Sequence, residues 1–183
     1  MSLREGGVGL LPTETVVGLV AGETGFSRLS SIKGRDPGKP IALLCASTEI
    51  AFALAREVSP LARLLAARFW PGPLTLVLGA QEGTVGVRVP AHPTAHALLV
   101  EYGGPLYATS ANLSGEPAPR ALQEVDKVLH AAVDFAVLGR PGSGEASAVV
   151  DLSGEQARLL RPTKYLTEAR LEQLEKASSS ATV

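Results

Sequence analysis

The sequence has 183 residues, of which 45% are hydrophobic and 19% charged, a composition typical of a packed globular domain and not of a disordered chain. A chain of this length accommodates one domain, or one domain with a tail, and can bury a substantial core. Its 17 basic and 18 acidic residues give a net charge of −1. This balance disfavours a general nucleic-acid binder unless the basic residues gather on one face.

A single cysteine, Cys45, excludes an intramolecular disulfide and a cysteine-rich zinc site, and is typical of a reducing compartment. The three histidines show no metal-type pairing with carboxylates or with the cysteine, so the sequence predicts no metal site of its own. The first seven residues lack the basic and apolar regions of a signal peptide, and the apolar runs are too short to cross a bilayer. We therefore expect a cytoplasmic protein that does not associate with membranes.

Apolar runs and turn residues predict the elements of the first half of the chain. In chain order they indicate strands over residues 8–11 and 16–21, a helix over 26–32, a strand over 41–45, helices over 49–56 and 61–69, and strands over 74–78 and 86–89. Ser47 or Thr48 is the candidate N-cap of the second helix, and Ser59 followed by Pro60 opens the third.

The second half predicts a helix over residues 94–100, a strand over 106–110, a helix over 120–130, and strands over 135–138, 148–152 and 156–160. Gly154 is the predicted hairpin turn between the last two strands. A charged helix begins at Thr167, and residues 178–183 form a polar tail that we expect to be frayed. We predict one domain over 1–166, with 167–183 as a C-terminal helix and tail. The irregular order of elements indicates an α/β fold whose twisted sheet mixes parallel and antiparallel strands and is flanked by helices.

A loop rich in glycine and proline carries three cations within seven residues: Lys33, Arg35 and Lys39. Cations on such a loop can converge on one anion, which favours a polyphosphate site. The alternative is a solvated surface loop, where neighbouring cations are common. The loop alone leaves both interpretations open.

A second polar segment, residues 109–112, follows an apolar strand and carries the side chains of Ser110 and Asn112. Ligands of α/β sheets bind at the carboxyl ends of strands, which favours a binding site here. The same side chains could instead cap their own turn, and both interpretations also apply to residues 12–15.

Two arginines lie in or beside apolar segments: Arg88 within a predicted strand, and Arg161 after two leucines. Because an unpaired buried charge is costly, both predict an anionic partner such as a polyanion or a carboxylate. Trp70 could stack on a base, but its position at the end of a predicted helix favours packing in the core. The sequence contains no P-loop and no serine-nucleophile signature, and Gly142-Ser143-Gly144 lacks the rest of a dinucleotide motif.

Seven motifs occur in order through nearly the whole chain. They are Pro12-Thr13-Glu14-Thr15-Val16-Val17-Gly18-Leu19, Lys33-Gly34-Arg35 to Lys39-Pro40, Trp70-Pro71-Gly72-Pro73-Leu74-Thr75, Val87-Arg88-Val89-Pro90, Ser110-Ala111-Asn112-Leu113-Ser114-Gly115, Ser147-Ala148-Val149-Val150-Asp151, and Arg161. Each is weak alone, but together they resemble the YrdC-like L-threonylcarbamoyladenylate synthase family in its single-domain form. The resemblance implies a YrdC-like α/β fold with a concave nucleotide-binding cavity.

The resemblance also implies a reaction. Threonine and bicarbonate form N-carboxythreonine, whose carboxylate attacks the α-phosphorus of ATP and releases pyrophosphate. The product, L-threonylcarbamoyladenylate, would supply the threonylcarbamoyl group for N6-threonylcarbamoyladenosine at position 37 of tRNA, through the threonylcarbamoyl transferase machinery of the same pathway. Mg²⁺ would accompany ATP, and weak contact with tRNA or double-stranded RNA is implied.

The resemblance assigns roles to residues of this sequence. The implied catalytic set is Lys33, Arg35, Ser110 and Asn112. The implied ATP-binding residues are Lys33, Arg35, Lys39, Thr84, Asn112, Arg120 and Arg161. The implied threonine-binding residues are Thr13, Arg88, Ser110 and Ser147. The chain departs from the family's pattern at three points. Val17 stands where the family commonly has an aromatic residue, and Lys39 occupies a variable position of the loop. Pro162 follows Arg161 where a glycine often comes next.

Three alternatives are a carbamoyl-transfer module of the same fold, a non-catalytic RNA-binding or ribosome-maturation factor, and a paralogue that binds nucleotide without turnover. The first is found within larger hydrogenase-maturation proteins, together with acylphosphatase and zinc-finger parts that this sequence does not contain. The net charge of −1 disfavours the second. The intact catalytic set disfavours the third.

Overall fold

A computed structural model of the chain describes residues 2–33, 41–113 and 115–180. Within these ranges the strands form one nine-stranded sheet of order β7-β1-β2-β6-β3-β5-β4-β8-β9. Three neighbouring pairs are parallel (β1–β7, β3–β5 and β4–β8), and the other five are antiparallel. The predicted mixed α/β sheet is therefore confirmed.

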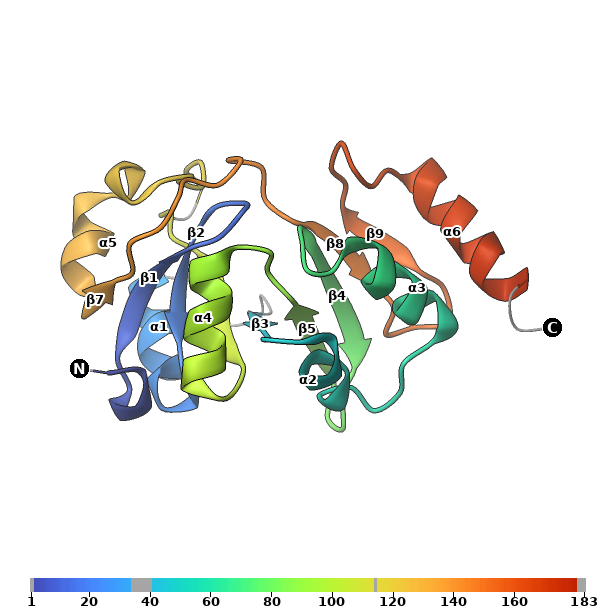
Figure 1. The fold of residues 1–183 in the computed structure, drawn as a ribbon, viewed down its shortest axis with the longest axis horizontal. Coiled ribbons are helices and arrows are strands. Elements are labelled where there is room, and N and C mark those ends of the chain that lie inside the picture. The colour runs from blue at the N-terminus through green and yellow to red at the C-terminus, as the bar shows by residue number, and fades with distance from the viewer. Residues whose placement is uncertain (1, 34–40, 114, 181–183) are drawn as a thin grey trace.

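The strands are β1 (Val8–Pro12), β2 (Val17–Ala21), β3 (Ala42–Leu44), β4 (Leu74–Gly79), β5 (Thr84–Arg88), β6 (Leu106–Ser110), β7 (Phe135–Ala136), β8 (Ala148–Asp151) and β9 (Arg158–Arg161). The α-helices are α1 (Phe26–Lys33), α2 (Thr48–Ala53), α3 (Pro60–Phe69), α4 (Pro93–Tyr102), α5 (Lys127–Ala132) and α6 (Glu168–Ser180). Short 3₁₀ helices are η1 (Leu3–Glu5), η2 (Glu23–Gly25) and η3 (Leu122–Glu124). Figure 1 shows α1, α4 and α5 over one half of the sheet, and α2, α3 and α6 over the other.

Local signals in the sequence explain where several helices begin and end. The hydroxyl of Ser47 accepts a hydrogen bond from the backbone of α2, and Ser59 does the same for α3, as the sequence predicts for N-caps. Helix α4 ends at Gly103, whose φ of 78° lies in the left-handed region that favours glycine.

Two expectations about helices differ from the structure, the second of them only as far as Ser180. The helix expected over 120–130 is interrupted, because the carboxylate of Asp126 accepts a hydrogen bond from Val128 and begins the separate helix α5. The tail expected to be frayed is helical as far as Ser180, and the hydroxyls of residues 178–180 donate to carbonyls one turn earlier. Residues 181–183 lie outside the described part of the chain.

Three clusters of buried side chains form the core. One lies between β3, β4, β5 and β8 and the helices α2, α3 and α6, and it includes Leu171 of α6. A second packs β1 and β2 against α1 and α5, and a third packs the other face of these strands against α4. Helix α6 therefore shares its core with the preceding residues, and the domain boundary at 166 stays a prediction.

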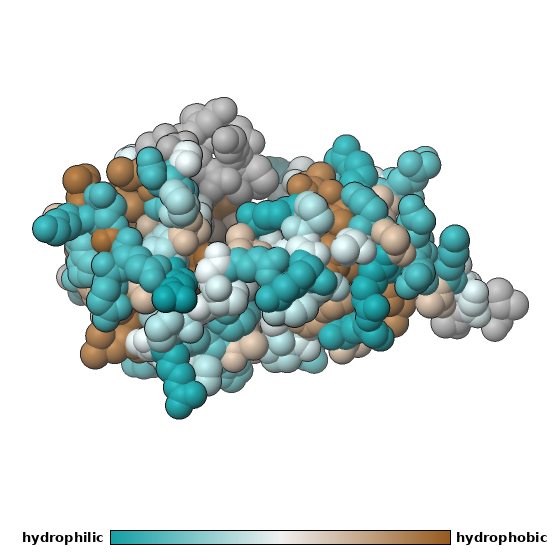
Figure 2. All heavy atoms as spheres, turned by 90° about the horizontal axis from the view of Figure 1, so that it is seen from above, coloured by the Kyte–Doolittle hydropathy of each residue, from teal (hydrophilic) through white to brown (hydrophobic). Residues whose placement is uncertain are grey.

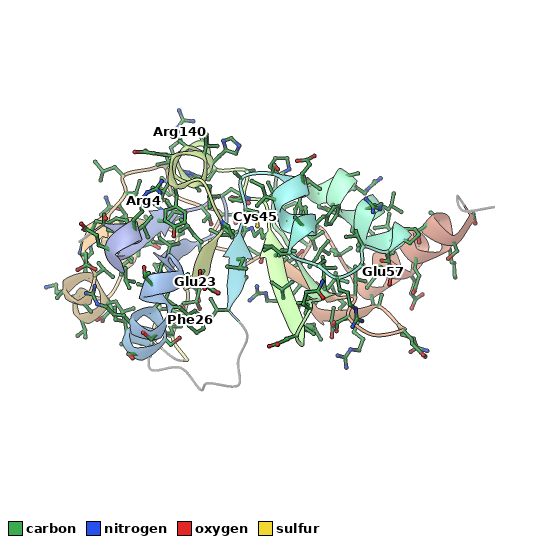
Figure 3. All side chains as sticks on the ribbon, turned by 90° about the horizontal axis from the view of Figure 1, so that it is seen from below. Arg4, Glu23, Phe26, Cys45, Glu57 and Arg140 are labelled. Atoms are coloured by element: carbon green, nitrogen blue, oxygen red, sulfur yellow. The ribbon has the colours of Figure 1, made fainter. Side chains whose placement is uncertain are left out.

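Trp70 and Cys45 both belong to the first of these clusters. The buried indole of Trp70 donates its N–H to the carbonyl of Leu74 at 2.7 Å, as expected for a core residue. Cys45 lies directly after β3 near the middle of the molecule (Figure 3), and burial raises the pKa of its thiol to about 12. A buried, neutral thiol is a poor nucleophile, so Cys45 is best described as a core residue.

None of the helices within 2–33, 41–113 and 115–180 is long and apolar enough to cross a bilayer. On the face drawn in Figure 2, hydrophobic side chains form separate small groups among hydrophilic ones.

Candidate functional site

A cavity of about 630 Å³ opens on the face of the sheet that α2, α3 and α6 leave uncovered. Seven adjacent strands, β2, β6, β3, β5, β4, β8 and β9, contribute residues to its lining. Because side chains alternate between the two faces of a strand, alternate residues of β3, β4 and β5 line the cavity while their neighbours enter the core. On β4, for example, Thr75 and Val77 line the cavity and Leu76 is buried in the first core cluster.

Small residues make the floor of this cavity. Gly18, Ala42, Gly86 and Ala108 line it from four different strands. A Cβ added to Gly86 would lie 3.6 Å from the Cα of Ala42, which is an ordinary contact. The backbone therefore tolerates a methyl group here, and a longer side chain would occupy the ligand space.

If ATP binds in this cavity, as the family resemblance implies, Gly86→Leu is expected to weaken its binding by roughly 10-fold or more, because the leucine side chain fills part of the cavity floor. Gly86→Ala is the matched control and is expected to bind ATP nearly as the wild type does. Isothermal titration calorimetry with ATP and Mg²⁺ gives both affinities, and thermal unfolding checks that both variants fold. Equal affinity for Gly86→Leu and wild type would place ATP elsewhere.

Arg88 forms one wall of the cavity and is 6% exposed. Its Nη2 donates to Oε1 of Glu14 at 2.5 Å and to the hydroxyl of Thr15 at 3.0 Å, and its Nε donates to the carbonyl of Gly72 at 3.1 Å. Within the described residues, no acceptor contacts Nη1. The guanidinium is thus fixed by the protein on two nitrogens and offers the third to a ligand.

The turn at residues 13–16 satisfies its own hydroxyls. Thr13 donates its proton to the carbonyl of Val16 at 2.7 Å and accepts from two backbone amides of the same turn. Thr15 is 2.8 Å from the Thr13 hydroxyl and also accepts from Arg88. Thr13 lines the cavity, but its hydroxyl proton is already used, as in the capping interpretation of this segment.

Arg161 and Ser147 form the opposite wall. Arg161 donates from Nε to the Ser147 carbonyl at 2.6 Å and from Nη2 to the Ser147 hydroxyl at 3.2 Å. The same hydroxyl lies 2.9 Å from that of Thr75. Burial, and next the positive charge of Arg88, lower the pKa of Arg161 from its usual value. Two like charges therefore face one cavity, which favours an anionic ligand.

Lys33 connects the end of α1 to the loop after β6. Its ammonium donates to the carbonyl of Ser110 at 2.7 Å and to the carbonyl and Oδ1 of Asn112 at 2.6 and 2.8 Å. The Ser110 hydroxyl donates to the same Oδ1 at 2.5 Å. The structure therefore brings Lys33, Ser110 and Asn112 of the implied catalytic set together at one end of the cavity.

Other implied site residues lie elsewhere. Arg35 and Lys39 fall outside the described residues. Thr84 begins β5 on the cavity side of the strand, two and four residues from Gly86 and Arg88, but it is exposed beyond the lining. Arg120 is exposed and pairs with Glu124 at 2.9 Å, away from the lining. Direct contact of Thr84 and Arg120 with ATP stays a prediction.

Three site residues have no assigned role in the sequence analysis: Glu14, Thr15 and Thr75. Glu14 pairs with Arg88, and its second oxygen is buried without a hydrogen-bond partner among the described residues. Thr75 is 7% exposed within the apolar strand β4, where a hydroxyl needs a partner. In the sequence, a single polar residue within an apolar run was the feature that could have identified Thr75 as a candidate site residue.

The described residues contain no cluster of three or more His, Cys, Asp or Glu that could hold a metal ion. His92 is buried and its Nε2 lies 3.2 Å from the carbonyl of Arg140, outside the cavity. The cavity lining, so far as it is described, consists of cations, hydroxyls, one amide, glycines and aliphatic residues. Such a site can bind and orient anions, but it offers no carboxylate ligand to a metal.

Fold and site together define an α/β protein with an open mixed sheet that carries a cavity lined by cations and hydroxyls. The family model for Sua5, YciO and YrdC proteins, described as "Telomere recombination", matches residues 1–163. The chain belongs to this family.

Relatives and a solved structure agree with this assignment. A threonylcarbamoyl-AMP synthase of Pyrococcus abyssi is 38% identical over 87% of this chain and 51% of its own length. A putative threonylcarbamoyl-AMP synthase of Mycobacterium tuberculosis is 35% identical over 94% of this chain and 86% of its own. The crystal structure of P. abyssi Sua5 complexed with L-threonine superposes with a TM-score of 0.86 at 36% identity, over 94% of this chain and 54% of that one. The chain thus spans about half the length of the P. abyssi relative.

Proposed function

We propose that the protein synthesises L-threonylcarbamoyladenylate from ATP, L-threonine and bicarbonate, with release of pyrophosphate. The observation that carries this proposal is that Arg88, Arg161 and Lys33 all line one cavity. The charge of Arg88 also lowers the pKa of Arg161. Both substrates supply the missing negative charge, threonine through its carboxylate and ATP through its phosphates. The names of the relatives, and the threonine complex of P. abyssi Sua5, support this choice of substrates.

The Arg88 wall and the Arg161 wall of the cavity are assigned to different groups of the substrates. We assign the carboxylate of threonine to Arg88, since its fixed guanidinium has Nη1 free of protein acceptors in the described chain. Arg161 and the Lys33 end are assigned to the phosphates, where buried cations neutralise charge most effectively. Ser110 and Asn112 then orient the reacting groups from the Lys33 end.

The chemical step needs no nucleophile from the protein. The carboxylate oxygen of N-carboxythreonine forms a bond to the α-phosphorus, the bond from that phosphorus to the bridging oxygen breaks, and pyrophosphate leaves with the electron pair. Positioning and charge neutralisation are the means by which enzymes promote such transfers. The cations and hydroxyls of this cavity can supply both.

Mg²⁺ is proposed to enter with ATP. When bound, it would neutralise charge on the phosphate oxygens that hold it. The described cavity lining contains no carboxylate, and Glu14 beside it is already paired with Arg88. The residues present therefore fit a metal held by ATP better than one held by the protein.

The product is a mixed anhydride, which a transferase of the same pathway would deliver to position 37 of tRNA. This division of labour agrees with the net charge of −1, since the synthase itself does not have to hold tRNA tightly. Contact with tRNA or double-stranded RNA is at most weak in this proposal.

The test is incubation with ATP, Mg²⁺, threonine and bicarbonate while pyrophosphate and the adenylate product are measured. Pyrophosphate release is expected to require both threonine and bicarbonate. Release that proceeds equally well without threonine would contradict the proposal. Salt-sensitive tRNA binding without any adenylate would favour an RNA-binding protein instead.

A further inference from the structure

Four side chains form a row across the sheet on the cavity side. Leu76 of β4 lies opposite Val87 of β5, which brings Thr75 next to Arg88. Thr75 is in register with Val149 of β8, and Val149 with Arg161 of β9. Arg88, Thr75, Val149 and Arg161 all line the cavity. Thr75 therefore occupies a position in this row between the two arginines.

The hydroxyls of Thr75 and Ser147 have one proton more than the protein uses. They lie 2.9 Å apart, and the Ser147 oxygen also accepts from Nη2 of Arg161. The bond between the two hydroxyls uses one of their two protons, whichever residue donates it. The described residues provide no acceptor for the second proton. One hydroxyl donor is thus left over in a nearly buried place, where a donor requires a partner.

We propose that Thr75 is a further substrate-binding residue. The remaining hydroxyl of the Thr75–Ser147 pair donates a hydrogen bond to an anionic oxygen of the amino-acid substrate that Arg88 holds. The assignment rests on the proposed function. The amino acid is chosen over ATP because Thr75 neighbours Arg88 in the row, whereas the Lys33 end of the cavity belongs to another part of the lining. A donor between two guanidiniums completes a site for an anionic oxygen.

The test compares Thr75→Val, which removes the hydroxyl at nearly constant volume, with Thr75→Ser, which keeps the hydroxyl and removes the methyl group. For Thr75→Val we expect the KM for threonine to rise roughly 10-fold, as for loss of a hydrogen bond to a charged group, while the KM for ATP changes little. Thr75→Ser is expected to stay close to wild type. Thermal unfolding shows whether each variant is folded, and Thr75→Ala replaces Thr75→Val if the latter does not fold.

Three results would overturn the assignment. They are a threonine KM of Thr75→Val equal to that of wild type, equal impairment of Thr75→Val and Thr75→Ser, and an increase confined to the KM for ATP. Calorimetry with threonine alone separates this assignment from the proposed function. If the wild type releases no threonine-dependent pyrophosphate, the proposed function fails, but weaker threonine binding by Thr75→Val than by wild type still supports the role of Thr75. Absence of threonine binding by the wild type overturns both.

Discussion

Replacing Lys33 by methionine is expected to reduce threonine-dependent pyrophosphate release by about 10²-fold or more, as for loss of a charge that acts in the transition state. The ammonium is nearly buried at the end of the cavity and holds both Ser110 and Asn112. Methionine keeps most of the length of the side chain but carries neither charge nor donors. The variant therefore removes charge neutralisation and the positioning of the two polar residues together.

A second variant separates these two effects of Lys33. Asn112→Ala removes the Oδ1 that Lys33 and Ser110 contact, but keeps the ammonium and its bonds to the backbone carbonyls. If the charge dominates, Asn112→Ala retains clearly more activity than Lys33→Met. Pyrophosphate release under saturating substrates and the unfolding temperature are measured for each. Wild-type turnover by a folded Lys33→Met variant would remove Lys33 from the mechanism.

Replacing Arg88 by glutamine is expected both to destabilise the protein and to abolish saturable threonine binding. The side chain of Glu14 is 23% exposed, and without Arg88 its carboxylate keeps no cationic partner among the described residues. Breaking a buried ion pair from one side costs about 3–5 kcal/mol, and partial exposure of Glu14 places the expected loss at the lower end of that range. Threonine loses the guanidinium to which we assign its carboxylate.

The double variant Glu14→Gln with Arg88→Gln distinguishes folding from binding. Removing both charges leaves no unpaired ion, so much of the lost stability is expected to return, while threonine binding stays absent. Glu14→Gln alone keeps Arg88 but loses the charged partner that holds its guanidinium. We expect this variant to weaken threonine binding less than Arg88→Gln or the double variant does. Denaturant unfolding and calorimetry with threonine measure the two quantities. Recovery of threonine binding in the double variant would contradict the role of Arg88.

Local patterns in the sequence predicted most of the elements. Apolar runs predicted all nine strands, because a strand buried on one or both faces needs a run of apolar residues within a few positions. Caps such as Ser59 fixed helix starts for the same local reason. The helix expected over 120–130 failed because Asp126 can cap a new helix as readily as it can occupy the middle of a long one.

Some features of the site could also be predicted from the sequence, and others could not. The motifs around Lys33, Arg88, Ser110 and Asn112 indicated both the family and an anionic ligand, because cations in apolar surroundings require one. They did not show that the Thr13 hydroxyl would be used by its own turn, nor that Arg120 would pair with Glu124. Hydrogen bonds within a turn compete with ligand binding, and the outcome depends on backbone geometry that residue types alone leave open.

By itself the sequence determined which segments become strands, which residues carry charge, and to which family the chain belongs, since each of these follows from local composition or motif order. Only the tertiary structure decided that Thr75 lies between Arg88 and Arg161. The alternation of side chains along a strand is local, but the order β5-β4-β8-β9 and its register arise from contacts between residues far apart in the chain. That order brings the donors Arg88, Thr75 and Arg161, which come from separate segments, into one row across the cavity.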